Sequence, residues 1–181
     1  MIKSTSVHEY VQLFKAYVSR CGAIPAEDRS SIVAKPVKRR NIWLIARGIS
    51  GDKGLAEMDP VASSPFELIH GGRLALEVRV REIRQRASRA TEVIAYRFSC
   101  SELPRNPNGI ECLRYDKPEA QRRGGDWDKE LGDNPRHPWA HLHVNFATST
   151  TANDSRLPTG RVCPILLLRA FDFWYCSTFG E

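Results

Sequence analysis

The sequence lacks the motifs that identify several common enzyme classes. It has no G-x-S-x-G nucleophile elbow, no glycine-rich phosphate loop ending in lysine, no G-x-G-x-x-G string after a strand and no H-E-x-x-H pair. These absences argue against a nucleotide triphosphatase, a dinucleotide-dependent oxidoreductase and a zinc protease of the common types. We therefore expect no cofactor.

The number and spacing of the cysteines indicate neither a set of disulfide bonds nor a zinc ribbon. The five cysteines are an odd number, and no two of them form a C-x-x-C pair. Neither a disulfide framework nor a zinc ribbon is indicated. We expect reduced, mostly buried thiols, with Cys100 and Cys112 as core residues of strands rather than nucleophiles.

Long apolar runs are also missing. The strongest run, residues 164–168, stops at Arg169, far short of the ~20 residues that a membrane-spanning helix needs. The first residues lack the apolar segment of a signal peptide. We expect a cytoplasmic protein that has no membrane partner.

What is present is the composition of a globular domain with an excess of positive charge. Hydrophobic residues make up 41% and charged residues 27% of the 181 residues, which is ordinary for a globular protein. The net charge is +6, from 27 Lys and Arg against 21 Asp and Glu. Such a balance favours encounters with RNA, DNA or an acidic partner, although solubility alone can also account for it.

Periodicity predicts two helices that flank a set of strands. Residues 6–20 repeat apolar side chains at helical spacing after a Ser6–Glu9 capping-box pattern. Residues 162–174 are apolar nearly all round, with Pro164 in the first turn, which indicates a buried or oligomer-facing helix. Alternating or β-rich stretches predict strands at 41–47, 74–81, 91–100, 110–115 and 139–146.

These elements predict an α+β fold, an antiparallel β-meander packed by an N-terminal amphipathic helix and an apolar C-terminal helix. The length fits a single domain over residues 1–181. Residues 1–72 supply the first helix, one strand and an irregular connection over 48–72, and residues 73–181 supply the meander and closing helix. The polar stretch 116–136 is too long for a hairpin and is typical of a lid or binding loop.

The strand predicted at 139–146 carries the clearest candidates for chemistry. Side chains two apart on a strand share a face, so His141, His143 and Asn145 point the same way. Histidine titrates near neutral pH, and two imidazoles side by side can act as general acid and general base on an RNA 2′-hydroxyl and a leaving 5′-oxygen. That chemistry needs no metal.

The same H-x-H geometry is also that of a metal-ligand pair. Third ligands would then come from the acidic and histidine residues of the long loop, namely Asp116, Asp126, Asp128 or His137. A third interpretation is structural, with both histidines on the polar face of a half-buried strand.

Residues on the two preceding strands extend the candidate site. A meander would bring Arg97 and Arg114 beside the histidines, where arginines can hold a scissile phosphate and stabilise its transition-state charge. Asp116 can orient a histidine, and Tyr115 can stack on a base or take part in proton transfer. An Arg–Asp pair that merely ties the end of the sheet is an equal alternative.

Further residues are candidates for binding substrate rather than for chemistry. They are basic or polar and lie on a strand face, in the long loop or beside the histidines: Arg79, Arg81, Arg122, Arg123, His137 and Asn145. A basic, flexible loop tip suits phosphate contact, but it is also the usual make-up of a solvated turn.

The order of these motifs resembles the TumE-like toxins of bacterial toxin–antitoxin modules. The resemblance covers roughly residues 73–175 and consists of an Arg-Leu pair before an alternating strand, then Y-R-F, R-Y-D, H-P and H-L-H-V strings, then an apolar helix. Those strings are Tyr96-Arg97-Phe98, Arg114-Tyr115-Asp116, His137-Pro138 and His141-Leu142-His143-Val144.

The resemblance implies a growth-inhibiting toxin neutralised by a cognate antitoxin. A nucleic-acid target agrees with the basic balance, and RNA cleavage by paired histidines is our hypothesis for its chemistry. Two alternatives stay open, a non-catalytic module that binds nucleic acid or protein, such as a phage-defence subunit, and a metal-dependent nuclease or hydrolase. The apolar C-terminal helix also makes self-association conceivable.

Overall fold

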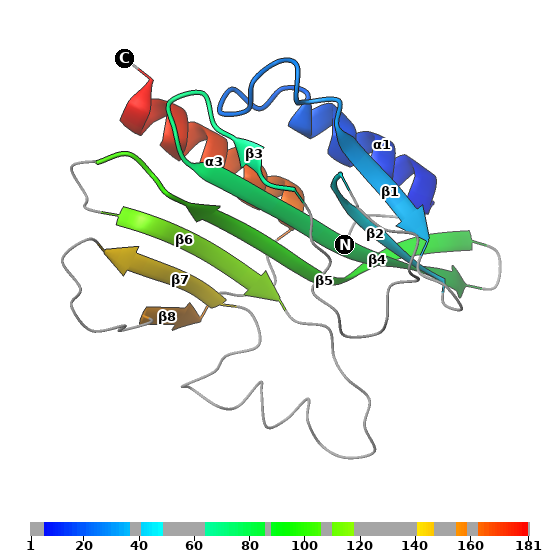
Figure 1. Ribbon diagram of the computed structural model, residues 1–181. Helices are drawn as coiled ribbons and strands as arrows, with labels where there is room; N and C mark the ends of the chain where they lie inside the picture. The colour runs from blue at the N-terminus through cyan, green and yellow to red at the C-terminus, as the bar shows by residue number, and fades with distance from the viewer. Residues whose placement is uncertain are drawn as a thin grey trace.

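Two helices pack on one face of an antiparallel sheet in the computed structural model (Figure 1). The structure describes residues 6–36, 41–48, 64–85, 88–105, 110–117, 141–146, 155–158 and 163–180. Its helices are α1 (Val7–Val18) and α3 (Pro164–Phe179). The strands are β1 (Ile32–Pro36), β2 (Ile42–Arg47), β3 (Phe66–Glu67), β4 (Arg73–Gln85), β5 (Ser88–Ser101), β6 (Ile110–Lys117), β7 (His141–Phe146) and β8 (Ser155–Pro158).

The sheet follows the order β1-β2-β4-β5-β6-β7-β8, and β3 pairs with β4 outside this path. Every pairing is antiparallel. The predicted α+β class is thereby confirmed. Because β5 to β8 follow one another in both sequence and space, residues of three sequence motifs come to lie on adjacent strands.

α1 forms where its capping and its apolar spacing agree. The Ser6 hydroxyl accepts a hydrogen bond from the Glu9 backbone N–H at 3.2 Å, and the Glu9 carboxylate accepts one from the Ser6 N–H at 2.7 Å. This reciprocal pair satisfies donors that the first turn leaves open. The buried side of the helix consists of Val7, Tyr10, Val11, Phe14 and Val18.

The long hairpin of β4 and β5 sets the two faces of the sheet. Alternate residues of β4 are buried, and they pair with buried residues of β5, so that Leu76 lies opposite Phe98 and Val78 opposite Tyr96. These residues belong to the core that α1 and α3 cover, and we call their side of the sheet the helix face. The positions between them, such as Arg97, form the opposite face.

One irregularity interrupts this hairpin. Arg79 pairs with Ala95 and Val80 with Val93, so Ile94 is an extra residue on β5. Such a bulge lets the two strands keep the same face toward the core on both sides of the irregularity. Val93 and Tyr96 are three residues apart, a spacing that would place them on opposite faces of a regular strand. Because of the bulge, both contribute to the core.

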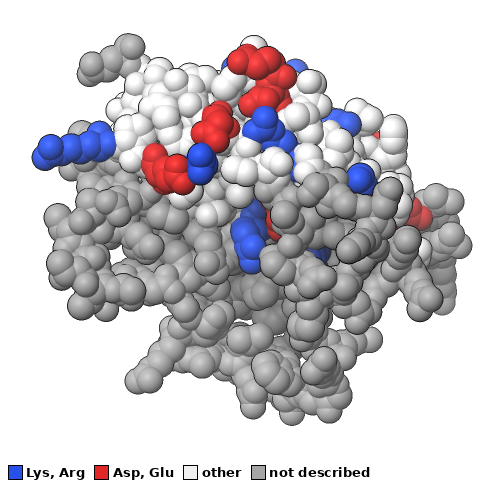
Figure 2. All heavy atoms as spheres, viewed as in Figure 1, with Lys and Arg blue, Asp and Glu red and all other residues white. Residues whose placement is uncertain are grey.

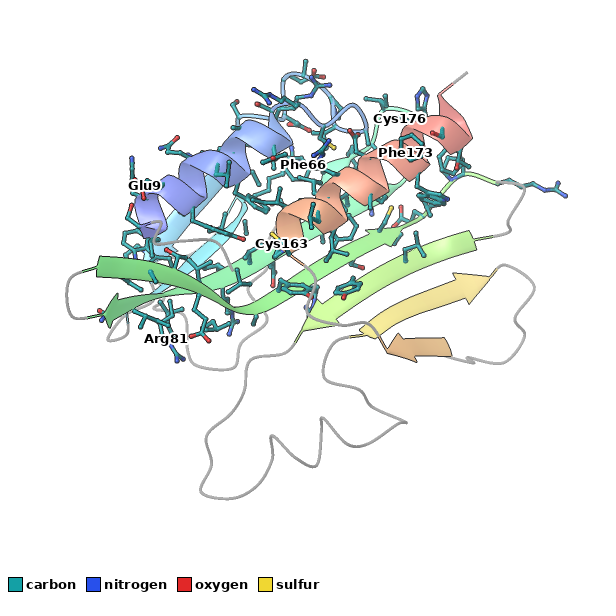
Figure 3. The ribbon with its side chains drawn as sticks, turned by 180° about the vertical axis from the view of Figure 1, so that it is seen from behind. Glu9, Phe66, Arg81, Cys163, Phe173 and Cys176 are labelled. Atoms are coloured by element: carbon teal, nitrogen blue, oxygen red, sulfur yellow. The ribbon has the colours of Figure 1, made fainter. Side chains whose placement is uncertain are left out.

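α3 is only partly apolar, in contrast to the predicted helix that is apolar nearly all round. Its buried residues are Pro164, Ile165, Leu168, Phe171 and Tyr175. The outer side includes Arg169 but also two exposed apolar side chains, Leu166 at 57% and Phe173 at 76%. Figure 3 shows Phe173 on this helix, above the sheet. Self-association through the helix stays a prediction.

Partly buried hydrogen bonds fix α3 to segments far away in the sequence. The Tyr175 hydroxyl accepts a hydrogen bond from the His70 backbone N–H at 3.0 Å and donates one to the Gly71 carbonyl at 2.7 Å. Gly71 has a φ of +94°, a conformation in which glycine avoids the strain of a side chain. Asp172 accepts a hydrogen bond from the Ala23 N–H at 2.8 Å.

Three strands were not predicted. β1 lies before the first predicted strand, β3 in the connection over 48–72, and β8 between the strand predicted at 139–146 and the closing helix. Of that connection, residues 49–63 lie outside the described part of the chain, as do residues 118–136 of the long polar stretch. Among the helices that the structure describes, none is long and apolar enough to cross a membrane.

Candidate functional site

Two rows of polar residues cross the sheet on its opposite face. In the first row, Asp116 on β6 pairs with Arg97 on β5 and with His141 on β7. Glu77 on β4 and Pro158 on β8 extend this row at its two ends. The row therefore joins residues of three predicted motifs on neighbouring strands.

The second row lies two residues further along the same strands. Arg114 on β6 pairs with Ser99 on β5 and with His143 on β7, and His143 also pairs with Arg156 on β8. Neighbouring strands are about 4.8 Å apart, and residues two apart on one strand about 6.8 Å. The two rows are thus adjacent on one face of the sheet, and we call their positions the patch.

Described side chains identify the face on which the rows lie. Tyr96, Phe98 and Tyr115 are 5%, 6% and 4% exposed and belong to the core. Arg97, between two of them, is exposed. Because side chains alternate along a strand, positions 114 and 116 fall on the same face as Arg97.

Tyr115 is the one predicted catalytic residue that lies away from this patch. Its ring stacks on Tyr96 with centroids 5.4 Å apart, inside the core beneath the helices. A ring packed there is not available to stack on a nucleic-acid base. Because side chains alternate along a strand, Tyr115 faces the core, and the positions before and after it, 114 and 116, belong to the other face.

The predicted binding residues are only partly described. Arg79 and Arg81 occupy β4 positions of the opposite face, and Figure 3 shows Arg81 extending away from the helices. Position 145 pairs with Cys112 and shares the face of positions 141 and 143. The remaining predicted residues lie outside the described part of the chain: Arg122, Arg123, His137, Asp126 and Asp128.

Besides Pro158, three polar residues of the patch were missed by sequence reasoning. Ser99 and Glu77 alternate with core residues on strands that were themselves predicted, so strand parity alone would have found them. Arg156 belongs to β8, whose short polar sequence carries no strand signal. Its pairing with His143 comes only from the fold.

Among the side chains that the structure describes, the resolved pKa shifts belong to groups in the core or packed against it. Burial, followed by the nearby Asp172 carboxylate, raises the pKa of the Cys21 thiol to about 12, and the same causes raise the pKa of Cys176. Thiolates are the reactive form of cysteine, so neither residue is suited to nucleophilic chemistry. Both sulfur atoms lie near one oxygen of Asp172, at 3.3 and 3.7 Å.

The described side chains contain neither a charged surface patch nor a metal-ligand group that would be an alternative functional site. Figure 2 shows Lys and Arg interspersed with Asp and Glu on the visible described surface rather than gathered in one patch. Among the side chains that the structure describes, which do not include those at positions 116, 141 and 143, no three His, Cys, Asp or Glu form a group that could hold a metal ion.

Comparisons with family models, curated proteins and solved structures found no match. The two rows on the opposite face are therefore the feature from which a function is inferred.

Proposed function

We propose that the opposite face of β5, β6 and β7 cleaves RNA. The observation that carries this proposal is the strand register, in which two arginines, an aspartate and two histidines occupy adjacent positions of two rows. Each residue type matches a need of phosphodiester cleavage. Histidine moves protons near neutral pH, and arginine stabilises the charge that gathers on the phosphate.

The proposed reaction uses the substrate's own 2′-hydroxyl as nucleophile. One histidine removes the proton from this hydroxyl, and its oxygen attacks the adjacent phosphorus. The bond from phosphorus to the 5′-oxygen breaks, and the other histidine gives a proton to that leaving oxygen. The products are a 2′,3′-cyclic phosphate and a free 5′-hydroxyl, so DNA is not a substrate.

Arginines supply the electrostatic part of this proposal. Arg97 on β5 belongs to the first row and Arg114 on β6 to the second, so the two positions are diagonal neighbours and would hold the scissile phosphate. Arg79 and Arg81 continue the same face along β4 and would contact flanking phosphates, which agrees with the net charge of +6. Single-stranded RNA fits a sheet face, because its backbone can lie across several strands.

The direct test is cleavage of a labelled single-stranded RNA oligonucleotide by the purified protein. We expect His141→Ala and His143→Ala each to lower the rate by about 100-fold or more. His8→Ala is the matched control, because His8 is an exposed histidine on α1. The DNA oligonucleotide of the same sequence should stay intact. Equal cleavage by all three variants would rule out the histidine roles.

A chelator arm separates this chemistry from the metal-dependent alternative. Cleavage that survives EDTA supports the proposal, and cleavage that EDTA abolishes and Mg²⁺ or Zn²⁺ restores favours metal-dependent hydrolysis. Salt-sensitive binding of RNA without any cleavage favours a binding module instead.

The resemblance to TumE-like toxins extends the proposal to the cell. We propose that the protein arrests bacterial growth and that a partner protein neutralises it. Induced expression of wild type beside His141→Ala, with growth and total RNA integrity as readouts, tests this role. Equal growth arrest by both proteins contradicts a toxic RNA-cleaving activity of the histidine rows.

A further inference from the structure

The two histidines of β7 stand in different electrical surroundings. His143 lies directly opposite an arginine on each neighbouring strand, Arg114 on β6 and Arg156 on β8. His141 lies directly opposite Asp116 on β6 and the uncharged Pro158 on β8. One histidine position is therefore flanked by two cations and the other by one anion.

Diagonal neighbours reduce this difference but do not cancel it. His141 has Arg114 and Arg156 as diagonal neighbours, and His143 has Asp116 and Cys112. Directly opposite residues have Cβ atoms about 5 Å apart, and diagonal ones about 7–8 Å. Since Coulomb energy falls with distance, each charge acts more strongly on the histidine that it faces directly.

The remaining residues around His141 and His143 are either common to both histidines, uncharged or further away. The histidines are neighbours of each other on β7, and position 145 beyond His143 is an uncharged asparagine. Arg97 and Glu77 lie further along the first row, beyond Asp116, and carry opposite charges. Asp116 is thus the anion that separates Arg97 from His141.

We propose that His141 is the general acid and His143 the general base of the site, with Asp116 as the positioning residue of His141. This division rests on the RNA cleavage proposed above. A carboxylate directly opposite His141 favours its protonated form, and two arginines directly opposite His143 favour its neutral form. His143 accepts the 2′-hydroxyl proton, and His141 gives its proton to the leaving 5′-oxygen.

The first experiment measures protonation without using RNA. NMR titration of the imidazole C–H signals, assigned with His141→Gln and His143→Gln, gives the two pKa values. We expect the value for His141 to exceed that for His143 by about one pH unit or more, from three charges at these spacings. Equal values, or a higher value for His143, overturn the division of roles.

Two substitutions should each change the pKa of mainly one histidine. Asp116→Asn should lower the pKa of His141 more than that of His143, and Arg156→Gln should raise mainly that of His143. Arg156→Lys keeps the charge and should leave both values near those of wild type. If Arg156→Gln and Arg156→Lys give the same shift, the effect is structural and the electrostatic basis of the proposal is wrong.

The second experiment follows RNA cleavage against pH. A base with the lower pKa and an acid with the higher one give a bell-shaped profile. Asp116→Asn should move the alkaline limb to lower pH, and Arg156→Gln should move the acidic limb to higher pH. Limbs that do not move, or move in the opposite direction, overturn the assignment.

The two experiments distinguish the two proposals. Cleavage with equal or reversed histidine pKa values overturns the division of roles and leaves the cleavage proposal standing. Separated pKa values without cleavage of RNA overturn the cleavage proposal and, with it, the catalytic roles, although the charge arrangement itself is then verified.

Discussion

Asp172 of α3 accepts a hydrogen bond from the backbone N–H of Ala23, 149 residues earlier in the chain, at 2.8 Å. The bond attaches the segment after α1 to the middle of α3. A buried N–H that loses its acceptor costs about 1–3 kcal/mol. One carboxylate therefore links two segments that lie far apart in the sequence.

We expect Asp172→Ala to lower the free energy of unfolding by about 1–3 kcal/mol, because the Ala23 N–H loses its acceptor. Asp172→Asn should cost less, since its amide oxygen can still accept that bond. Urea denaturation measures both variants. Equal losses in the two would show that the charge matters rather than the hydrogen bond to Ala23.

Removal of two buried tyrosine hydroxyls should have different effects on the free energy of unfolding. Tyr175→Phe removes a hydroxyl that bonds both His70 and Gly71, and we expect a loss of about 1–3 kcal/mol in stability. The Tyr10 hydroxyl is buried without a hydrogen-bond partner among the described residues. Tyr10→Phe should be neutral or stabilising. Thermal unfolding of both variants checks this contrast, and a larger loss for Tyr10→Phe contradicts it.

Alkaline pH should destabilise the fold through Cys21. Its pKa rises on folding from 9.0 to about 12, mainly because of burial. Between these values the unfolded chain loses the proton and the folded chain keeps it, so stability is full below about pH 9 and falls as pH rises. One such group gives a slope of about 1.4 kcal/mol per pH unit.

Urea midpoints of wild type and Cys21→Ala between pH 8 and 11 test this slope. The stability difference between the two proteins should shrink or reverse as pH rises, because the variant lacks the titrating thiol. Parallel curves would exclude Cys21 as a cause. Burial raises the pKa of Tyr175 to about 12. Because this tyrosine is present in both proteins, part of the loss of stability at alkaline pH should remain in both.

Two phenylalanines of α3 should differ strongly in their effect on stability. Phe171 is 6% exposed and packs edge-on against Phe98 with centroids 5.1 Å apart, and Phe173 is 76% exposed. We expect Phe171→Ala to cost about 3–5 kcal/mol and Phe173→Ala to stay within about 0.5 kcal/mol. Chemical denaturation measures both. Similar losses would mean that Phe173 is covered in solution.

Local patterns allowed α1 and the central strands to be predicted. Ser6 and Glu9 mark the start of α1, and the alternation from Leu74 to Val80 marks β4, because in both cases one periodicity dominates the stretch. α3 was predicted less well. The helix has a buried and an exposed side. Because apolar residues occur on both sides, the moderate polarity of the exposed side is not apparent in the sequence.

The rows of the candidate site could be predicted only in part. Strand parity assigns His141 and His143 to one face, but it does not say which residue of β6 or β8 lies opposite each of them. That register depends on hydrogen bonding between strands and on turns, as in the pairing of His143 with Arg156. β8 itself is too short and polar to be recognised, so half of the charge around His143 was not visible in the sequence.

The extra residue Ile94 determines how β5 can change in length during evolution. Loss of Ile94 would turn the bulge into regular pairing and leave every other side chain on its present face. Loss of a residue from positions 95–100 would exchange the faces of the residues between it and the bulge, since side chains alternate along the strand. Relatives of this protein should therefore tolerate a one-residue deletion at the bulge and at few other places in β5.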